Sequence, residues 1–123
     1  MALVLETVLK NVLADAIDAE INTGAGTANL KFETAVDAEV ATINFQNPAF
    51  GAAAAGVITL AGVPLSDTNA TGGTGAQFSL SDRDGTKQLE GVVAVSGQDL
   101  DLSSLSVGAG DTVELTSFTI TIP

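Results

Sequence analysis

The chain has no histidine, cysteine, tryptophan or tyrosine, and its aromatic residues are five phenylalanines. Without histidine it lacks the usual general base near neutral pH and an imidazole metal ligand. Without cysteine it lacks a thiolate nucleophile, a zinc–sulfur site and a disulfide. Catalysis would have to rest on carboxylates, hydroxyls or a few basic residues, so we expect no enzyme activity, no metal site and no cofactor.

Positive charge is also scarce, because 4 basic residues stand against 15 acidic ones and the net charge is −11. A surface this acidic repels phosphate backbones, so we expect no nucleic-acid binding. No apolar run approaches the roughly 20 residues that cross a bilayer, and the start of the chain lacks the basic residues of a signal peptide. We therefore expect a soluble protein made in the cytoplasm, with no membrane contact, whose charge keeps it dissolved.

What the chain does contain is typical of a small, mainly β domain. Its 123 residues suffice for a single domain, 1–123, and 13 glycines with many Ala, Val, Thr and Ile suit short strands joined by turns. Residues 1–24 are predicted to form an N-terminal helix that ends in a glycine cap at Gly24. Residues 27–123 are predicted to form the strands.

Over the first 21 residues, apolar side chains recur at spacings of three and four, which predicts an amphipathic α-helix. Its polar side is acidic, whereas helices that lie on membranes are normally rich in Lys and Arg. We therefore expect the apolar stripe to pack on the chain's own sheet or on a neighbouring subunit. The stripe comprises Leu5, Val8, Leu9, Val12, Leu13, Ala16, Ile17 and Ile21.

After Gly26 the apolar period shortens from 3.6 to 2, as in β-strands. An Asp-Gly turn at Asp84 and Gly85 predicts a hairpin, residues 66–75 are predicted to be a mobile loop, and a bulge is predicted at Thr116 and Ser117. About seven short strands with frequent turns indicate an immunoglobulin-like β-sandwich. The alternating segments are 30–33, 40–45, 57–60, 76–80, 89–95, 100–105 and 112–122.

Acidic residues near turns are the remaining candidate sites. Asp82 and Asp84 match part of a calcium-binding loop, but the spacing of an EF-hand would place ligands at Leu80 and Gly91, so a hairpin turn accounts for them better. Asp99 and Asp101 lie on one face of an extended segment. They would bind a divalent cation only with a further carboxylate nearby, from Asp111 or Glu114, and a solvated strand face is the default interpretation.

Three segments carry a resemblance to a known family: NVLADAIDAEINTG (11–24), NPAFGAAAAGVITL (47–60) and the tail LSSLSVGAGDTVELTSFTITIP (102–123), together with the turn at 82–85. The chain resembles small virion-associated proteins encoded by tailed phages and prophages. This resemblance implies a structural component of the virion. We expect a capsid decoration (cement) protein on the outer shell, whose partners are the major capsid protein and copies of itself, with a trimer favoured among small symmetric oligomers.

Two other functions remain open. One is a tail-associated component, in the tube, baseplate or fibre attachment, although a receptor-binding protein would more often carry Tyr or Trp anchors. The other is a calcium- or carbohydrate-binding adhesion module that acts through the aspartates at 82, 84, 99, 101 and 111. The candidates for subunit contacts are apolar residues of the helix and two phenylalanines: Leu5, Val8, Leu9, Val12, Leu13, Ile17, Phe45 and Phe50.

Overall fold

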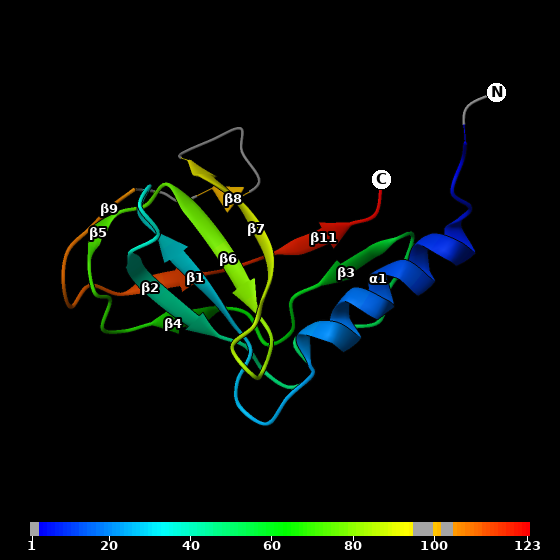
Figure 1. Cartoon of the computed structure of the whole chain (residues 1–123), viewed down its shortest axis with the longest axis horizontal. Helices are drawn as coiled ribbons and strands as arrows, with labels where there is room; N and C mark the ends of the chain where they lie inside the picture. Colours follow the sequence, from blue (N-terminus) through cyan, green and yellow to red (C-terminus); the bar gives the residue numbers. More distant parts are fainter. Residues whose placement is uncertain (1–2, 95–99, 102–104) are drawn as a thin grey trace.

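A computed structural model describes residues 3–94, 100, 101 and 105–123. In these residues a single α-helix precedes a series of short strands, so this part of the chain is mainly β (Figure 1). The elements are α1 (Thr7–Ile21), β1 (Asn29–Glu33), β2 (Glu39–Asn44), β3 (Val57–Thr59), β4 (Leu65–Asp67), β5 (Gly73–Thr74), β6 (Gln77–Ser81), β7 (Lys87–Ala94), β8 (Leu100–Asp101), β9 (Ser106–Val107), β10 (Val113–Leu115) and β11 (Thr119–Thr121).

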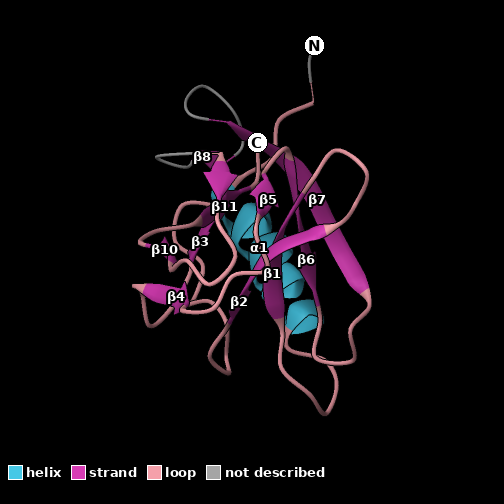
Figure 2. Ribbon diagram, turned by 90° about the vertical axis from the view of Figure 1, so that its left-hand side faces the viewer, coloured by secondary structure: helices cyan, strands magenta, loops and turns pink. Residues whose placement is uncertain are grey.

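The strands form one larger sheet and three small ones. The larger sheet has the order β2-β1-β6-β7-β8, antiparallel except for the parallel pair β7–β8. The small sheets are the antiparallel pairs β10–β4, β11–β3 and β5–β9. Figure 2 shows β3, β4 and β10 on one side of the molecule and β6 and β7 on the other.

The period-2 pattern explains the centre of the larger sheet. Leu30 of β1 lies between Ile43 of β2 and Leu80 of β6, and all three side chains are fully buried. Lys31, next along β1, points to the opposite face and is half-buried. This alternation is the pattern that places one face of an antiparallel sheet against a core.

The predicted hairpin between 76–80 and 89–95 is confirmed as β6 and β7. Asp82 organises its turn, because its carboxylate accepts the backbone N–H groups of Asp84 at 3.0 Å and Thr86 at 2.9 Å and the side-chain amide of Gln88 at 3.0 Å. These bonds replace water around a buried carboxylate. The backbone N–H of Thr86 is the chief reason that the pKa of Asp82 lies below its ordinary value, and burial acts in the opposite direction.

Three predicted boundaries are wrong. The helix begins at Thr7, not at the start of the chain, because Glu6 has extended backbone angles. The predicted last strand, 112–122, is two strands that pair with different partners, β10 with β4 and β11 with β3. The loop predicted at 66–75 contains β5 and most of β4. The predictions at Val95, Asp99 and Leu102 lie outside the described residues.

The phenylalanines form much of the core. Phe45, Phe50, Phe118 and Phe78 make consecutive ring contacts, with centroids 6.0, 6.3 and 5.8 Å apart. Such edge and tilted contacts are favourable beyond the burial of the rings. Phe45 is 6% exposed and Phe50 is 2% exposed. Their proposed place in a subunit contact is therefore corrected: both side chains stabilise the fold, and neither offers surface to a partner.

Candidate functional site

Helix α1 lies at one end of the molecule, beside β3 (Figure 1). It is attached by polar side chains that face the loop 49–56. Asn22 and Asp18 accept the backbone N–H groups of Ala49 and Phe50 at 2.9 and 3.1 Å. Asp15 and Asn11 accept those of Ala53 and Gly56 at 2.9 and 2.8 Å. We call the side chains of Asn11, Asp15, Asp18 and Asn22 the polar ladder.

The ladder follows from the geometry of a helix. Its members are spaced by four, three and four residues, so they lie on one face. The loop runs antiparallel to the helix, and its small residues supply no side-chain acceptors for their own N–H groups. Backbone N–H groups that turn away from water need partners, and the helix provides four acceptors for this loop. This explains why a polar face is turned toward the body of the protein.

Within the ladder, Asp18 has the most enclosed carboxylate. Burial raises its pKa above the ordinary value, the hydrogen bonds from Phe50 and Asn22 oppose this, and the neighbouring charge of Asp15 adds to it. Asn22 donates its amide to Asp18 at 2.9 Å. Two ladder members therefore hold each other in position as well as the loop.

Because the polar face points inward, the apolar stripe points outward. Val8 is 77% exposed, Val12 59%, Leu9 46% and Leu13 39%, while Leu3 and Val4 ahead of the helix are 94% and 72% exposed. Of the two expectations for the stripe, packing within the chain holds only near its end, where Ile21 is fully buried and Ile17 is partly buried against the core. Packing on a neighbouring subunit stays a prediction for the rest of the stripe. We call Leu3, Val4, Val8, Leu9, Val12 and Leu13 the outer apolar face.

A groove continues this face. It has a volume of about 410 Å³ and lies between α1, β7 and the residue that follows β11. Glu20 and Gln88 are its polar lining residues. The apolar lining residues are Leu13, Ala16, Ile17, Ile21, Leu89 and Ile122. Leu13 belongs to both surfaces, so the outer apolar face and the groove form one continuous apolar region.

This region can bind a partner by excluding water. Fully burying a Val or Leu side chain stabilises a complex by about 1.5–3 kcal/mol. Contiguous exposed apolar surface of this kind marks an interaction site on soluble proteins, whereas scattered apolar residues do not. The six predicted helix contacts, Leu5, Val8, Leu9, Val12, Leu13 and Ile17, all lie on or beside this region, and all six are exposed or partly exposed.

Three of the five aspartates that could have bound calcium, Asp82, Asp84 and Asp111, have structural partners. Asp84 Oδ1 accepts the backbone N–H of Ala25 at 3.3 Å, and Asp111 Oδ2 accepts that of Gly108 at 2.8 Å. The carboxylate of Asp82 accepts hydrogen bonds within the hairpin turn. Across the described residues, no group of three or more His, Cys, Asp or Glu side chains is placed to hold a metal. Asp99 lies outside those residues.

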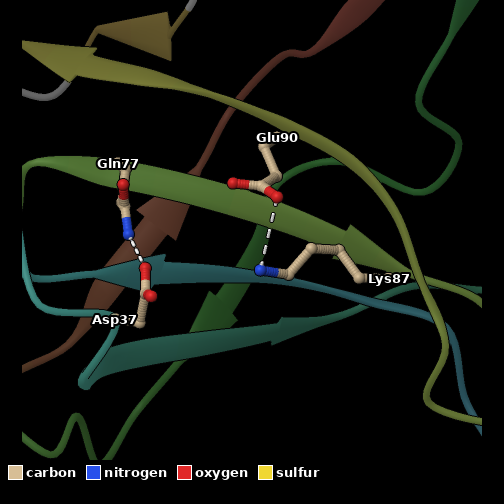
Figure 3. A network of polar contacts seen from close by, with 4 residues as sticks. All are labelled: Asp37, Gln77, Lys87 and Glu90. Atoms are coloured by element: carbon tan, nitrogen blue, oxygen red, sulfur yellow. Dashed lines mark hydrogen bonds and ion pairs between the residues drawn. The ribbon is translucent and has the colours of Figure 1, made fainter.

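Polar pairs on the larger sheet are ordinary surface contacts (Figure 3). Gln77 of β6 donates its side-chain amide to Asp37, in the turn between β1 and β2. Lys87 and Glu90 of β7 form an ion pair with an N–O distance of 3.5 Å between half-exposed side chains. Exposed ion pairs contribute about 0–1 kcal/mol. The helix end of the molecule is thus the better candidate for a binding surface.

Sequence reasoning identified the stripe but missed the ladder. The signal was present in the regular spacing of Asn11, Asp15, Asp18 and Asn22 along the polar side of the helix. Among the described residues, no helix is long and apolar enough to cross a membrane. No protein-family model, curated protein or solved structure matches the chain.

Proposed function

We propose that the protein is a structural component of a bacteriophage virion, and most specifically a capsid decoration protein on the outer shell. The observation that carries this proposal is the outer apolar face: a helix that turns its polar side to its own fold and its apolar side to solvent. Such a face is suited to burial against another protein. The sequence resemblance points to the same class of protein.

The composition supports a role in assembly over a role in chemistry. A net charge of −11 keeps a protein of high copy number dissolved before it reaches its binding site. Many weak contacts on a repetitive shell then add up through avidity. All five phenylalanines are buried, so no exposed aromatic anchor is available for a receptor or sugar.

We also propose that the fold is an immunoglobulin-like sandwich. In this arrangement the small sheets β10–β4 and β11–β3 form a second layer against the face of the larger sheet that carries Leu30, Phe32 and Phe78. Support comes from the core, where Val113, Leu115 and Phe118 belong to the same buried cluster as those three residues. Strand β2 also contacts β4 and β10, which joins the two layers at one edge.

Imaging of purified particles by cryo-electron microscopy tests the proposal. We expect density for the chain on the outer shell, in hundreds of copies by quantitative mass spectrometry. Density along the tail, in six or twelve copies, would move the protein to the tail and reject the capsid assignment. Absence from the particle would reject the virion function.

A binding assay then tests the surface. Particles that lack the protein are mixed with purified wild-type chain or with a Val8→Ser/Val12→Ser variant, and bound chain is measured by sedimentation. We expect the variant to lose at least about tenfold in affinity, because two exposed apolar side chains that contact the shell, or the next copy bound to it, are removed. Val36 is 83% exposed in the turn between β1 and β2, so Val36→Ser is the matched control and should bind normally.

A further inference from the structure

The residues ahead of α1 form an apolar arm. Leu3 is 94% exposed and Val4 is 72% exposed, and Glu6 has extended backbone angles. Figure 1 shows this segment leading away from the strands at the end of the helix. The arm, residues 3–5, is uncharged and contributes little to the core of its own chain. An apolar peptide exposed to water is suited to insertion into a neighbouring groove.

The groove beside α1 has the chemistry to receive such a peptide. A cavity of about 150 Å³ accommodates a benzene ring, so 410 Å³ gives room for two or three apolar side chains. Its polar lining residues suit a peptide backbone: Glu20 carries a carboxylate acceptor, and Gln88 already uses its amide N–H on Asp82, which leaves its carbonyl oxygen as an acceptor. The groove therefore matches a neutral, extended, apolar segment.

We propose that the groove of one copy binds the Leu3–Leu5 arm of a second copy, so that copies associate head to tail. This inference rests on the proposed assembly role and names the partner of the apolar region. Arm and groove are different surfaces of the same chain, so the contact is heterologous and generates a ring where the rotation closes. A ring of two copies would have two-fold symmetry. The smallest ring without that symmetry has three copies.

The apolar region runs from the arm along the outer side of α1 into the groove, which favours a second copy over a small ligand. A stable interface takes about 800 Å² from each partner, which an arm of three residues cannot supply alone. The helix follows the arm directly in sequence, so an inserted arm brings Val8 and the next turns of the outer apolar face onto the neighbour. A membrane surface fits less well, because the charged residue at the groove is the acidic Glu20.

Two variants separate the arm from the groove. Leu3→Ser/Val4→Ser removes the apolar arm without changing charge or any buried contact. Ala16→Arg fills the groove from an exposed position in the helix. Because arginine lowers the net negative charge, a loss of association in this variant cannot come from added repulsion. Val36→Ser is the control for removal of an exposed apolar side chain far from both surfaces.

The measurement is the mass of each purified chain by size-exclusion chromatography with light scattering, over roughly 5 to 200 μM. We expect wild type and Val36→Ser to form the same closed oligomer, and the arm and groove variants each to be monomeric with unchanged circular dichroism. Mixed together, those two variants should form a one-to-one dimer, because the intact arm of one fits the intact groove of the other.

Three results would overturn the inference. They are a wild type that is monomeric throughout, a wild-type oligomer that survives in both variants, and a mixture of the variants that stays monomeric. The last result would indicate a symmetric helix–helix contact. A monomer that sediments with vesicles of phosphatidylcholine and phosphatidylglycerol would instead assign the face to lipid. A monomer that still binds phage particles would leave the proposed function standing without this interface.

Discussion

Asp18 Oδ1 accepts the backbone N–H of Phe50 at 3.1 Å, across 32 residues of sequence, and the same oxygen accepts the side-chain amide of Asn22 at 2.9 Å. Phe50 is in turn packed between Phe45 and Phe118. A single carboxylate thus links the helix to the aromatic core, and the helix is oriented by these directional bonds together with the burial of Ile21 near its end.

Two replacements of Asp18 should therefore distinguish its role as a hydrogen-bond acceptor from the effect of its charge. Asp18→Ala leaves the N–H of Phe50 without its partner, and we expect a loss of about 1–3 kcal/mol in the free energy of unfolding, measured by urea denaturation. Asp18→Asn keeps an oxygen in the same place and should be close to wild type. Equal losses in both variants would show that charge, and not hydrogen bonding, attaches the helix.

The pH dependence of the Asp18→Asn variant follows from the raised pKa of Asp18. In the folded state the ionised carboxylate is disfavoured, so wild type gains stability as pH falls through the folded pKa and has gained it fully below the ordinary value of 3.8. Any advantage of Asp18→Asn should be largest at neutral pH and should shrink in acid. An advantage that grows in acid would contradict the direction of the shift.

Asp82 should behave in the opposite way. Its pKa is lowered, so its contribution to stability is fully present above the ordinary value of 3.8 and is lost as pH falls through the folded pKa. We expect Asp82→Asn to be less stable than wild type at pH 7 and to approach it in strong acid. Thermal unfolding at a series of pH values measures how the stability of the Asp18→Asn and Asp82→Asn variants changes with pH. Each variant serves as the control for the other.

Gly24 joins the end of the helix to the hairpin turn. Its φ is +118°, and a Cβ placed there would lie 2.6 Å from the carboxyl carbon of Asp84. Gly85 has a φ of +86° with nothing within 4 Å of such a Cβ. We expect Gly85→Ala to cost about 1–2 kcal/mol through its backbone angle alone, and Gly24→Ala to cost more, by chemical denaturation. Equal costs would mean that Asp84 moves away freely.

Core and outer positions of the helix should differ sharply in the monomer. Ile21 is fully buried, so Ile21→Ala should cost about 2–5 kcal/mol in the free energy of unfolding. Val12 is 59% exposed, so Val12→Ala should change it by no more than about 0.5 kcal/mol. Both are measured in dilute solution on the Leu3→Ser/Val4→Ser background. A large loss for Val12→Ala would mean that the outer apolar face is covered within the chain.

The sequence predicted the mainly β fold, the leading helix and the central hairpin. Alternation at Leu30 and Phe32 and the Asp-Gly turn are local signals, and the structure follows them. The orientation of the helix was left open between the chain's own sheet and a neighbouring subunit, because periodicity identifies an apolar stripe and does not show which face the rest of the chain contacts. That contact is made by the N–H groups of Ala49, Phe50 and Ala53, far away in the sequence. Likewise, no local sequence pattern predicted that β10 and β11 pair with different strands.

The alanine-rich run of the loop has a fixed length. Ala53 and Gly56 meet helix positions four residues apart, so the three steps of loop between them match a little more than one helical turn. Exchanging Ala52 or Ala54, both exposed, for another small residue leaves that match intact. Deleting one alanine would shift every later amide away from its acceptor. A segment of low complexity is here a spacer, in which the exposed alanines can be exchanged and the number of residues cannot be changed.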